Sequence, residues 1–211
     1  GNAGKIVRSQ NGRSVGDKRL AKLDCASRHE RLVVDAVTGK LKELGFTVRE
    51  DDTAAKVEGE AGNVCAYLKG TAKGCVLFAA HLDRVQNGLG IKPQLKDGNL
   101  VSDGTTILAA DDLSGVAAIL DGIRRVLASG KPYPRIEVLF SVCEEIGVQG
   151  TKHLDTSLFE AKYGFVLDSP GRVGRVLDAA MGKAELFLDI KGKAPSFNWG
   201  LIPKPFCTRS K

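Results

Sequence analysis

The chain has 211 residues, of which 43% are hydrophobic and 27% charged, and this is enough for one α/β domain with a substantial core. It contains no run of about 18 apolar residues, so we expect no membrane span and no membrane partner. The net charge of +6 comes largely from the first 31 residues and the tail after Asp189, which predicts a solvated basic surface and no nucleic-acid partner.

The predicted elements alternate between helix and strand. Ser27 to Glu30 fit a capping box, in which Ser27 caps the following helix and Glu30 reaches back. Apolar spacing continues that helix to Gly45, and a second helix runs from residue 113 to about residue 130. Further short helical structure is expected around 150–160, and strands at 46–49, 63–68, 75–80, 107–110, 136–143, 163–167, 173–177 and 183–191. This alternation predicts an α/β fold with a mostly parallel sheet and helices on both faces.

The cysteines indicate a compartment. The chain has five, an odd number, and they form no Cys-x-x-Cys pair. Three of them, Cys65, Cys75 and Cys143, lie inside apolar runs, where a thiol behaves as a small core residue. We therefore expect free thiols in a reducing compartment, the cytoplasm, and we see no secretion signal.

Four apolar runs end in side chains that can bind a metal or carry a proton. In chain order these side chains are His81 and Asp83, Asp111 and Asp112, Glu144 and Glu145, and Asp168. Ligands gather outside the carboxyl ends of strands in an open α/β sheet, so parallel runs would place all seven groups at one edge. Such crowded carboxylates are tolerated when divalent cations neutralise them. Mixed His and carboxylate ligation favours two ions that share a bridging carboxylate, with Zn²⁺ as the expected metal and Co²⁺ or Mn²⁺ as alternatives.

Each motif also has a structural interpretation. Two acids before a helix can act as an N-cap, two acids after a strand can simply be solvated, and Asp168 before Ser-Pro-Gly can begin a turn. The repetition of the pattern at four successive strand ends favours the metal site over these separate explanations.

The four motifs resemble those of the co-catalytic zinc exopeptidases, a family that includes peptidase T, carboxypeptidase G and acetylornithine deacetylase. The resemblance covers residues 28–194, and the stretch from Gly90 to Leu108 is most similar to the peptidase T branch. The matching motifs are Ala-His81-Leu-Asp83, Ala-Ala-Asp111-Asp112-Leu-Ser-Gly115, Cys-Glu144-Glu145-Ile-Gly147 and Leu-Asp168.

The resemblance implies a metal ligand set. His81 and Asp168 would bind a first metal, Glu145 would bind a second, and Asp111 would bridge both. The peptide bond between Asp111 and Asp112 would be cis.

The resemblance also implies an activity. Glu144 would be the general base of a two-metal hydrolysis, and Asp83 would hydrogen-bond His81 and fix its tautomer. The implied enzyme is a tripeptide aminopeptidase-like exopeptidase, homodimeric in its full-length form, that hydrolyses short peptides. Two alternatives stay open, an N-acyl amino acid deacylase that uses the same site and a non-catalytic metal-binding remnant.

The chain departs from the family toward its C-terminus. The family has a further His ligand there, whereas the remaining histidines here, His29 and His153, are expected to be surface or structural residues. We therefore expect a truncated chain, or a short relative, with an N-terminal extension at 1–27 and a partial catalytic domain at 28–180. The start of a largely absent lid domain would occupy 181–194, and an aberrant basic tail 195–211. Arg84 and Leu113 also differ from the common Thr and Lys, which could change local charge or substrate preference.

Overall fold

The computed structural model describes residues 18–85, 88–169 and 174–179. The chain divides into two compact units, Gly1–Pro170 and Gly171–Lys211, and the fold and site below belong to the first. The expected strand at 183–191, the lid segment at 181–194 and the tail at 195–211 lie outside the described residues. Residues 174–177, expected to be part of a strand, are irregular.

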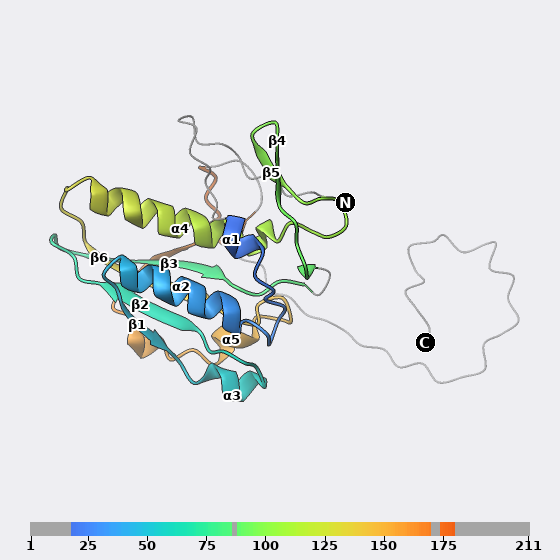
Figure 1. Ribbon diagram of the computed structural model, residues 1–211. Coiled ribbons are helices and arrows are strands. Elements are labelled where there is room, and N and C mark those ends of the chain that lie inside the picture. The colour runs from blue at the N-terminus through green and yellow to red at the C-terminus, as the bar shows by residue number, and fades with distance from the viewer. Residues whose placement is uncertain (1–17, 86–87, 170–173, 180–211) are drawn as a thin grey trace, which may run out of the picture. The chain divides into compact units, whose positions relative to one another are not determined.

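Helices and strands alternate along the first unit (Figure 1). The helices are α1 (Lys18–Ala21), α2 (Arg31–Glu43), α3 (Thr53–Val57), α4 (Ala110–Ala128) and α5 (Gln149–Lys152), with a 3-10 turn at Thr156–Leu158. The strands are β1 (Thr47–Glu50), β2 (Val64–Leu68), β3 (Cys75–His81), β4 (Gln94–Lys96), β5 (Asn99–Val101), β6 (Arg135–Ser141) and β7 (Gly164–Val166). None of the helices in these described ranges could cross a membrane.

The main sheet has five strands in the order β1-β2-β6-β3-β7, while β4 and β5 form a separate hairpin. β2 pairs antiparallel with both β1 and β6, and β3 pairs parallel with both β6 and β7. Four of these five strands therefore run in one direction, and only β2 opposes them. β6, β3 and β7 consequently end at the same edge of the sheet, as the sequence led us to expect.

The core lies between one face of the sheet and the two long helices, α2 and α4. Both helices bury apolar side chains at helical spacing. On the sheet, residues that are paired across strands point to the same face, which makes one continuous apolar layer. Its buried members are Val33, Val34, Val37 and Leu41 of α2, Val116, Ile119 and Ile123 of α4, and Val64, Ile136, Val138 and Phe140 of the sheet.

Two local predictions were wrong. Residues 107–109 are irregular rather than a strand, and α4 begins at Ala110 directly after Ala109, whose φ of 56° is left-handed. The capping box is absent, because α2 begins at Arg31 and neither expected partner caps it. The Ser27 hydroxyl instead donates to Asp83, and the Glu30 carboxyl accepts from the N–H groups of Arg28 and Cys143. Glu30 is buried and Ser27 is partly buried, so both side chains need hydrogen-bond partners from the surrounding interior.

Four of the five cysteines lie in the described ranges, and all four are free thiols, as expected. Cys25, Cys65 and Cys143 are buried, whereas Cys75 is partly exposed. Burial raises the pKa of Cys65 and Cys143 to about 12, so these thiols stay protonated and inert at neutral pH. Cys207 lies outside the described residues.

Candidate metal centre

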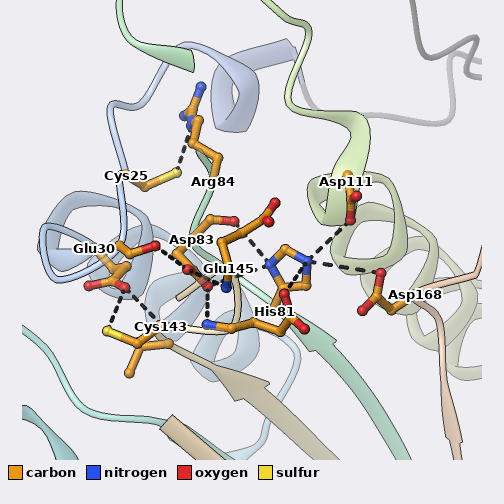
Figure 2. A network of polar contacts seen from close by, with 12 residues as sticks. Cys25, Glu30, His81, Asp83, Arg84, Asp111, Cys143, Glu145 and Asp168 are labelled. Atoms are coloured by element: carbon orange, nitrogen blue, oxygen red, sulfur yellow. Dashed lines mark hydrogen bonds and ion pairs between the residues drawn. The ribbon is translucent and has the colours of Figure 1, made fainter. Parts of the chain in front are cut away.

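The expected ligands gather at the edge where β6, β3 and β7 end (Figure 2). His81 is the last residue of β3, Asp168 follows β7, and Glu144 and Glu145 lie in the turn after β6. Asp111 reaches the same place from the first turn of α4. The site is therefore built from three strand ends and one helix start, rather than from four strand ends.

The imidazole of His81 is the centre of the cluster. Its Nε2 lies 3.2 Å from Asp111 Oδ1, 3.8 Å from Glu144 Oε2 and 3.9 Å from Asp168 Oδ1. The His81 side chain is 2% exposed, whereas that of Asp111 is 74% exposed. The cluster thus has a buried floor at His81 and opens to solvent on the Asp111 side.

Two sets of three side chains could each hold an ion. His81, Asp111 and Glu145 form one set, and His81, Glu144 and Asp168 form the other. Within each set the potential ligand atoms all lie within 4.8 Å of one another. The five residues therefore lie together. The two sets differ from the ligand assignment that the resemblance implied, because they include Glu144 as a possible ligand.

Asp83 is buried beneath this cluster and connects its parts. One carboxylate oxygen accepts from the N–H of Glu144 at 2.8 Å, and the other accepts from the N–H of Glu145 at 3.1 Å and from the Ser27 hydroxyl at 2.6 Å. His81 Nδ1 lies 3.0 Å from the backbone carbonyl of Asp83 and 3.5 Å from its carboxylate. Both Asp83 groups thus face Nδ1, which leaves Nε2 directed at the carboxylates above.

Crowding of acids in this partly buried place changes several pKa values. Burial raises the pKa of Asp168 to about 6, and the charges of Asp111 and Glu144 act in the same direction. Burial alone would lower the pKa of His81, but the hydrogen bond and charge of Asp83, with the charge of Asp168, raise it to about 10. These shifts show carboxylates that repel one another and attract positive charge, which is the electrostatic condition for cation binding.

Asp112 points inward from the first turn of α4. It is 2% exposed, its Oδ1 accepts from the Gly115 N–H at 3.1 Å, and burial raises its pKa to about 8, with the charge of Asp168 adding to the effect. A Cβ at Gly115 would overlap Asp112 Oδ1 and lie 2.6 Å from the carbonyl oxygen of Leu167. Glycine therefore lets α4 approach the end of β7. The Asp111–Asp112 peptide bond is cis, as the resemblance implied.

The turn that carries Glu144 and Glu145 is fixed from below by Asn63. This side chain is 0% exposed, and its Oδ1 accepts from the Val142 N–H at 3.1 Å. Its Nδ2 donates to Asp51 Oδ2, Thr53 Oγ1 and the Gly150 carbonyl at 2.8 to 3.0 Å. Asn63 thus holds both ends of the segment 142–150.

The two residues that depart from the family pattern have different surroundings. Leu113 is 5% exposed and packs in the core. Arg84 is 0% exposed, and its guanidinium donates to Cys25 Sγ and to the carbonyls of Ala21 and Gly88. Arg84 therefore binds the N-terminal segment to the loop after β3.

A pocket of about 520 Å³ adjoins the cluster at Glu145. Its other lining residues are Ser27, Arg28, Arg84, Val85, Ile146 and Gln149. The two expected non-ligand histidines lie elsewhere. His29 is exposed and pairs with Glu60 at 2.8 Å, and His153 ends α5.

Sequence reasoning missed three residues that shape the site. Ser27 and Glu30 were assigned to a helix cap, and Asn63 to an ordinary strand start. Glu30 carried a usable signal, because an acid three and four residues before Val33 and Val34 shares the buried face of α2. Asp83, the partner of Ser27, and Val142 and Gly150, the partners that link Asn63 to the site, lie 56 to 87 residues away along the chain, so local pattern could not find them.

The family model of peptidase family M28 matches residues 63–191, more than half of the chain. The chain belongs to this family.

Individual relatives of this M28 member agree with that assignment. It is 38% identical over 175 residues to the uncharacterized protein YqjE of Bacillus subtilis, which covers 82% of this chain and 47% of that protein. It is 36% identical over 138 residues to peptidase T of Salmonella arizonae, and the match covers 64% of this chain and 33% of that protein.

Solved structures confirm the expected fold class and the peptidase T resemblance. Aminopeptidase PepT from Bacillus cereus is 38% identical, with a TM-score of 0.72 over 76% of this chain and 46% of that one. A tripeptidase from Staphylococcus aureus is 28% identical, with a TM-score of 0.70 over 75% of this chain and 45% of that one. The chain spans about half the length of these relatives.

Proposed function

We propose that this chain provides the metal-binding part of a metal-dependent exopeptidase that hydrolyses short peptides. The observation that carries the proposal is the gathering of five potential ligands in two sets at one edge of the sheet, namely His81, Asp111, Glu144, Glu145 and Asp168. The peptidase T and tripeptidase relatives give the reaction class.

The donor set fits divalent cations. One imidazole and several carboxylates suit Zn²⁺, with Co²⁺ or Mn²⁺ as alternatives. Five potential ligands are more than one tetrahedral ion needs, which favours two ions. His81, Asp111, Glu145 and Asp168 would hold them, as the family resemblance implies. When bound, such ions supply Lewis acidity toward the scissile carbonyl and lower the pKa of water.

The protein's own groups have distinct tasks in this reaction. Glu144, which is 31% exposed and lies beside His81, would take the proton from the attacking water and pass it to the leaving amine. Asp83 would keep His81 Nδ1 hydrogen-bonded, so that Nε2 stays available as a ligand. Because Asp83 also accepts from the Glu144 N–H, it would couple the position of the base to that of the imidazole.

The pocket beside Glu145 is the proposed place for the peptide. Its volume of about 520 Å³ suits a short substrate, and the Glu145 carboxylate in its lining would attract a free N-terminal amine. We propose a homodimeric full-length parent, no nucleic-acid or membrane partner, and a cytoplasmic location, which the free thiols favour.

Metal content tests the first step. After dialysis against trace Zn²⁺ at neutral pH, we expect about two ions per chain by elemental analysis. Asp111→Ala should bind fewer ions, while Asp121→Asn, an acid-to-amide control farther along α4, should match the wild type. No bound metal in a folded wild-type chain would overturn the proposal.

A substrate panel tests the second step. Unblocked tripeptides should be cleaved, N-acetyl amino acids should not, and Glu144→Gln should abolish turnover while metal is retained. Preference for N-acetyl amino acids would indicate a deacylase instead. Metal binding without turnover on either class, and no effect of Glu144→Gln, would indicate a metal-binding remnant.

A further inference from the structure

Glu30 is a buried acid that neither the helix nor the proposed reaction uses. It is 0% exposed and precedes α2, yet it makes no capping hydrogen bond to that helix. Its Oε1 accepts from the N–H of Arg28 at 3.0 Å and from the N–H of Cys143 at 3.0 Å, with Cys143 Sγ at 3.4 Å. Its Oε2 is buried and has no hydrogen-bond partner. Burial of a carboxyl group in this state is costly, so its position needs an explanation.

The partner of Glu30 begins the turn that carries two site residues. Cys143 has a φ of 55°, a left-handed conformation that costs a non-glycine residue about 1–2 kcal/mol. The next two N–H groups, of Glu144 and Glu145, donate to the two carboxylate oxygens of Asp83. Three successive backbone N–H groups are thus held by two buried carboxyl groups, as successive N–H groups in a nest hold an anion. Figure 2 shows Glu30 and Asp83 directed at the turn that carries Cys143 and Glu145.

The two carboxyl groups, of Asp83 and Glu30, have different consequences for the site. Asp83 holds the N–H groups of the site residues themselves, and it also faces His81. Glu30 holds only the residue before them, in the conformation that turns the chain from β6 toward the cluster. Without the Glu30 acceptor, the Cys143 N–H would be buried and unpaired, and its left-handed conformation would lose its constraint.

We propose that Glu30 is a positioning residue that acts through Cys143 to hold Glu144 and Glu145 in place for metal binding. This inference rests on the proposed function for the identity of the metal site. It also gives the N-terminal segment a task, because Glu30 supports this turn directly and Ser27, three residues earlier, supports it through Asp83.

The test compares three variants of the whole chain. Glu30→Met removes the acceptor and keeps the length of the side chain with an apolar group that suits a buried site. Glu30→Gln keeps an acceptor oxygen in the same place. Val37→Ala is the matched control, because it removes buried atoms from the same helix at a residue that is 0% exposed.

Two measurements are made on each variant, Zn²⁺ affinity by competition with a chromophoric chelator and amide hydrogen exchange of 143–145 in the metal-free chain. Glu30→Met should weaken Zn²⁺ binding roughly tenfold, the lower end of what outer-shell changes cost. It should also accelerate exchange at these three amides more than elsewhere. Glu30→Gln should restore both quantities, and Val37→Ala should change neither selectively.

The outcomes separate this inference from the proposed function. A wild-type chain that binds no Zn²⁺ overturns the proposed function, and exchange at 143–145 then decides the role of Glu30 by itself. Unchanged exchange at these amides in Glu30→Met, or the same selective effect in Val37→Ala, would overturn the positioning role.

Discussion

Replacing Asn63 by alanine should be among the most destabilising single changes away from the metal ligands. The side chain makes four hydrogen bonds in the interior, to Val142, Asp51, Thr53 and Gly150. Because Nδ2 has two N–H groups for its three acceptors, about three of these bonds count in full, and at about 1 kcal/mol each their loss costs about 3 kcal/mol. The buried Val142 N–H would also be left unpaired, which adds about 1 kcal/mol or more and brings the cost to about 4 kcal/mol. That is a large share of the 5–15 kcal/mol typical of a domain, so roughly a quarter or more of the stability should disappear.

Urea unfolding followed by circular dichroism measures this loss, with the free energy taken from the midpoint and slope. Thr53→Val is the matched control, because it removes one of the four bonds and leaves the backbone partners satisfied, at a cost of about 1 kcal/mol. The argument is refuted if Asn63→Ala costs no more than Thr53→Val. A cost near 4 kcal/mol with an unchanged slope would support it.

Three further predictions concern α4, β6 and the metal. Gly115→Ala should lower the free energy of unfolding, measured in urea, by about 1–3 kcal/mol and weaken Zn²⁺ binding, because the new Cβ would push α4 away from the Leu167 carbonyl. An unchanged free energy of unfolding would contradict the close approach of α4 to Leu167. Burial alone would raise the pKa of the Glu137 carboxyl, but the N–H groups of Glu160 and Ala161 and the guanidinium of Arg135 lower that pKa. The ionised carboxyl therefore stabilises the fold above the unfolded-state pKa of about 4.3, and this contribution is lost as the pH falls through the folded-state pKa. Glu137→Gln should therefore be less stable than wild type at pH 7, and the gap should narrow in urea titrations as the pH falls below 4.3; a constant gap would refute the linkage. Finally, Zn²⁺ at 100 times its dissociation constant should raise the free energy of unfolding by about 2.7 kcal/mol, EDTA should reverse this, and Asp111→Ala should show a smaller gain.

The sequence predicted the parts of the fold that depend on local periodicity. Continuous apolar runs identified β3 and β6 as central strands, and the residue after each run proved to lie at the common edge. The same logic failed for 107–110, because four apolar residues fit a strand and a buried helix approach equally well. Asp111 still reached the cluster, since α4 begins where the sheet edge lies.

The site's supporting residues could not be predicted because their partners are remote in sequence. Ser27 and Glu30 match a capping box in spacing and chemistry, and the local interpretation required nothing else. What decides their real contacts is the burial of Asp83 and Cys143, which exists only once the sheet has formed. The seven groups that could bind a metal or carry a proton were recognisable because metal chemistry restricts the residue types at such a site. A supporting hydrogen bond, by contrast, can be made by many residue types.

The contact between Glu30 and Cys143 also sets an order of events during synthesis. The two residues are 113 positions apart, so at a synthesis rate of 5–20 residues per second Cys143 is added roughly 6 to 23 s after Glu30. β2 and β3 are both synthesised during that interval, but they do not pair with each other, so the sheet cannot be completed before β6 is made. The metal ligands can therefore assemble only late, after β6 has inserted between β2 and β3 and brought the turn at 143–145 onto the waiting acid.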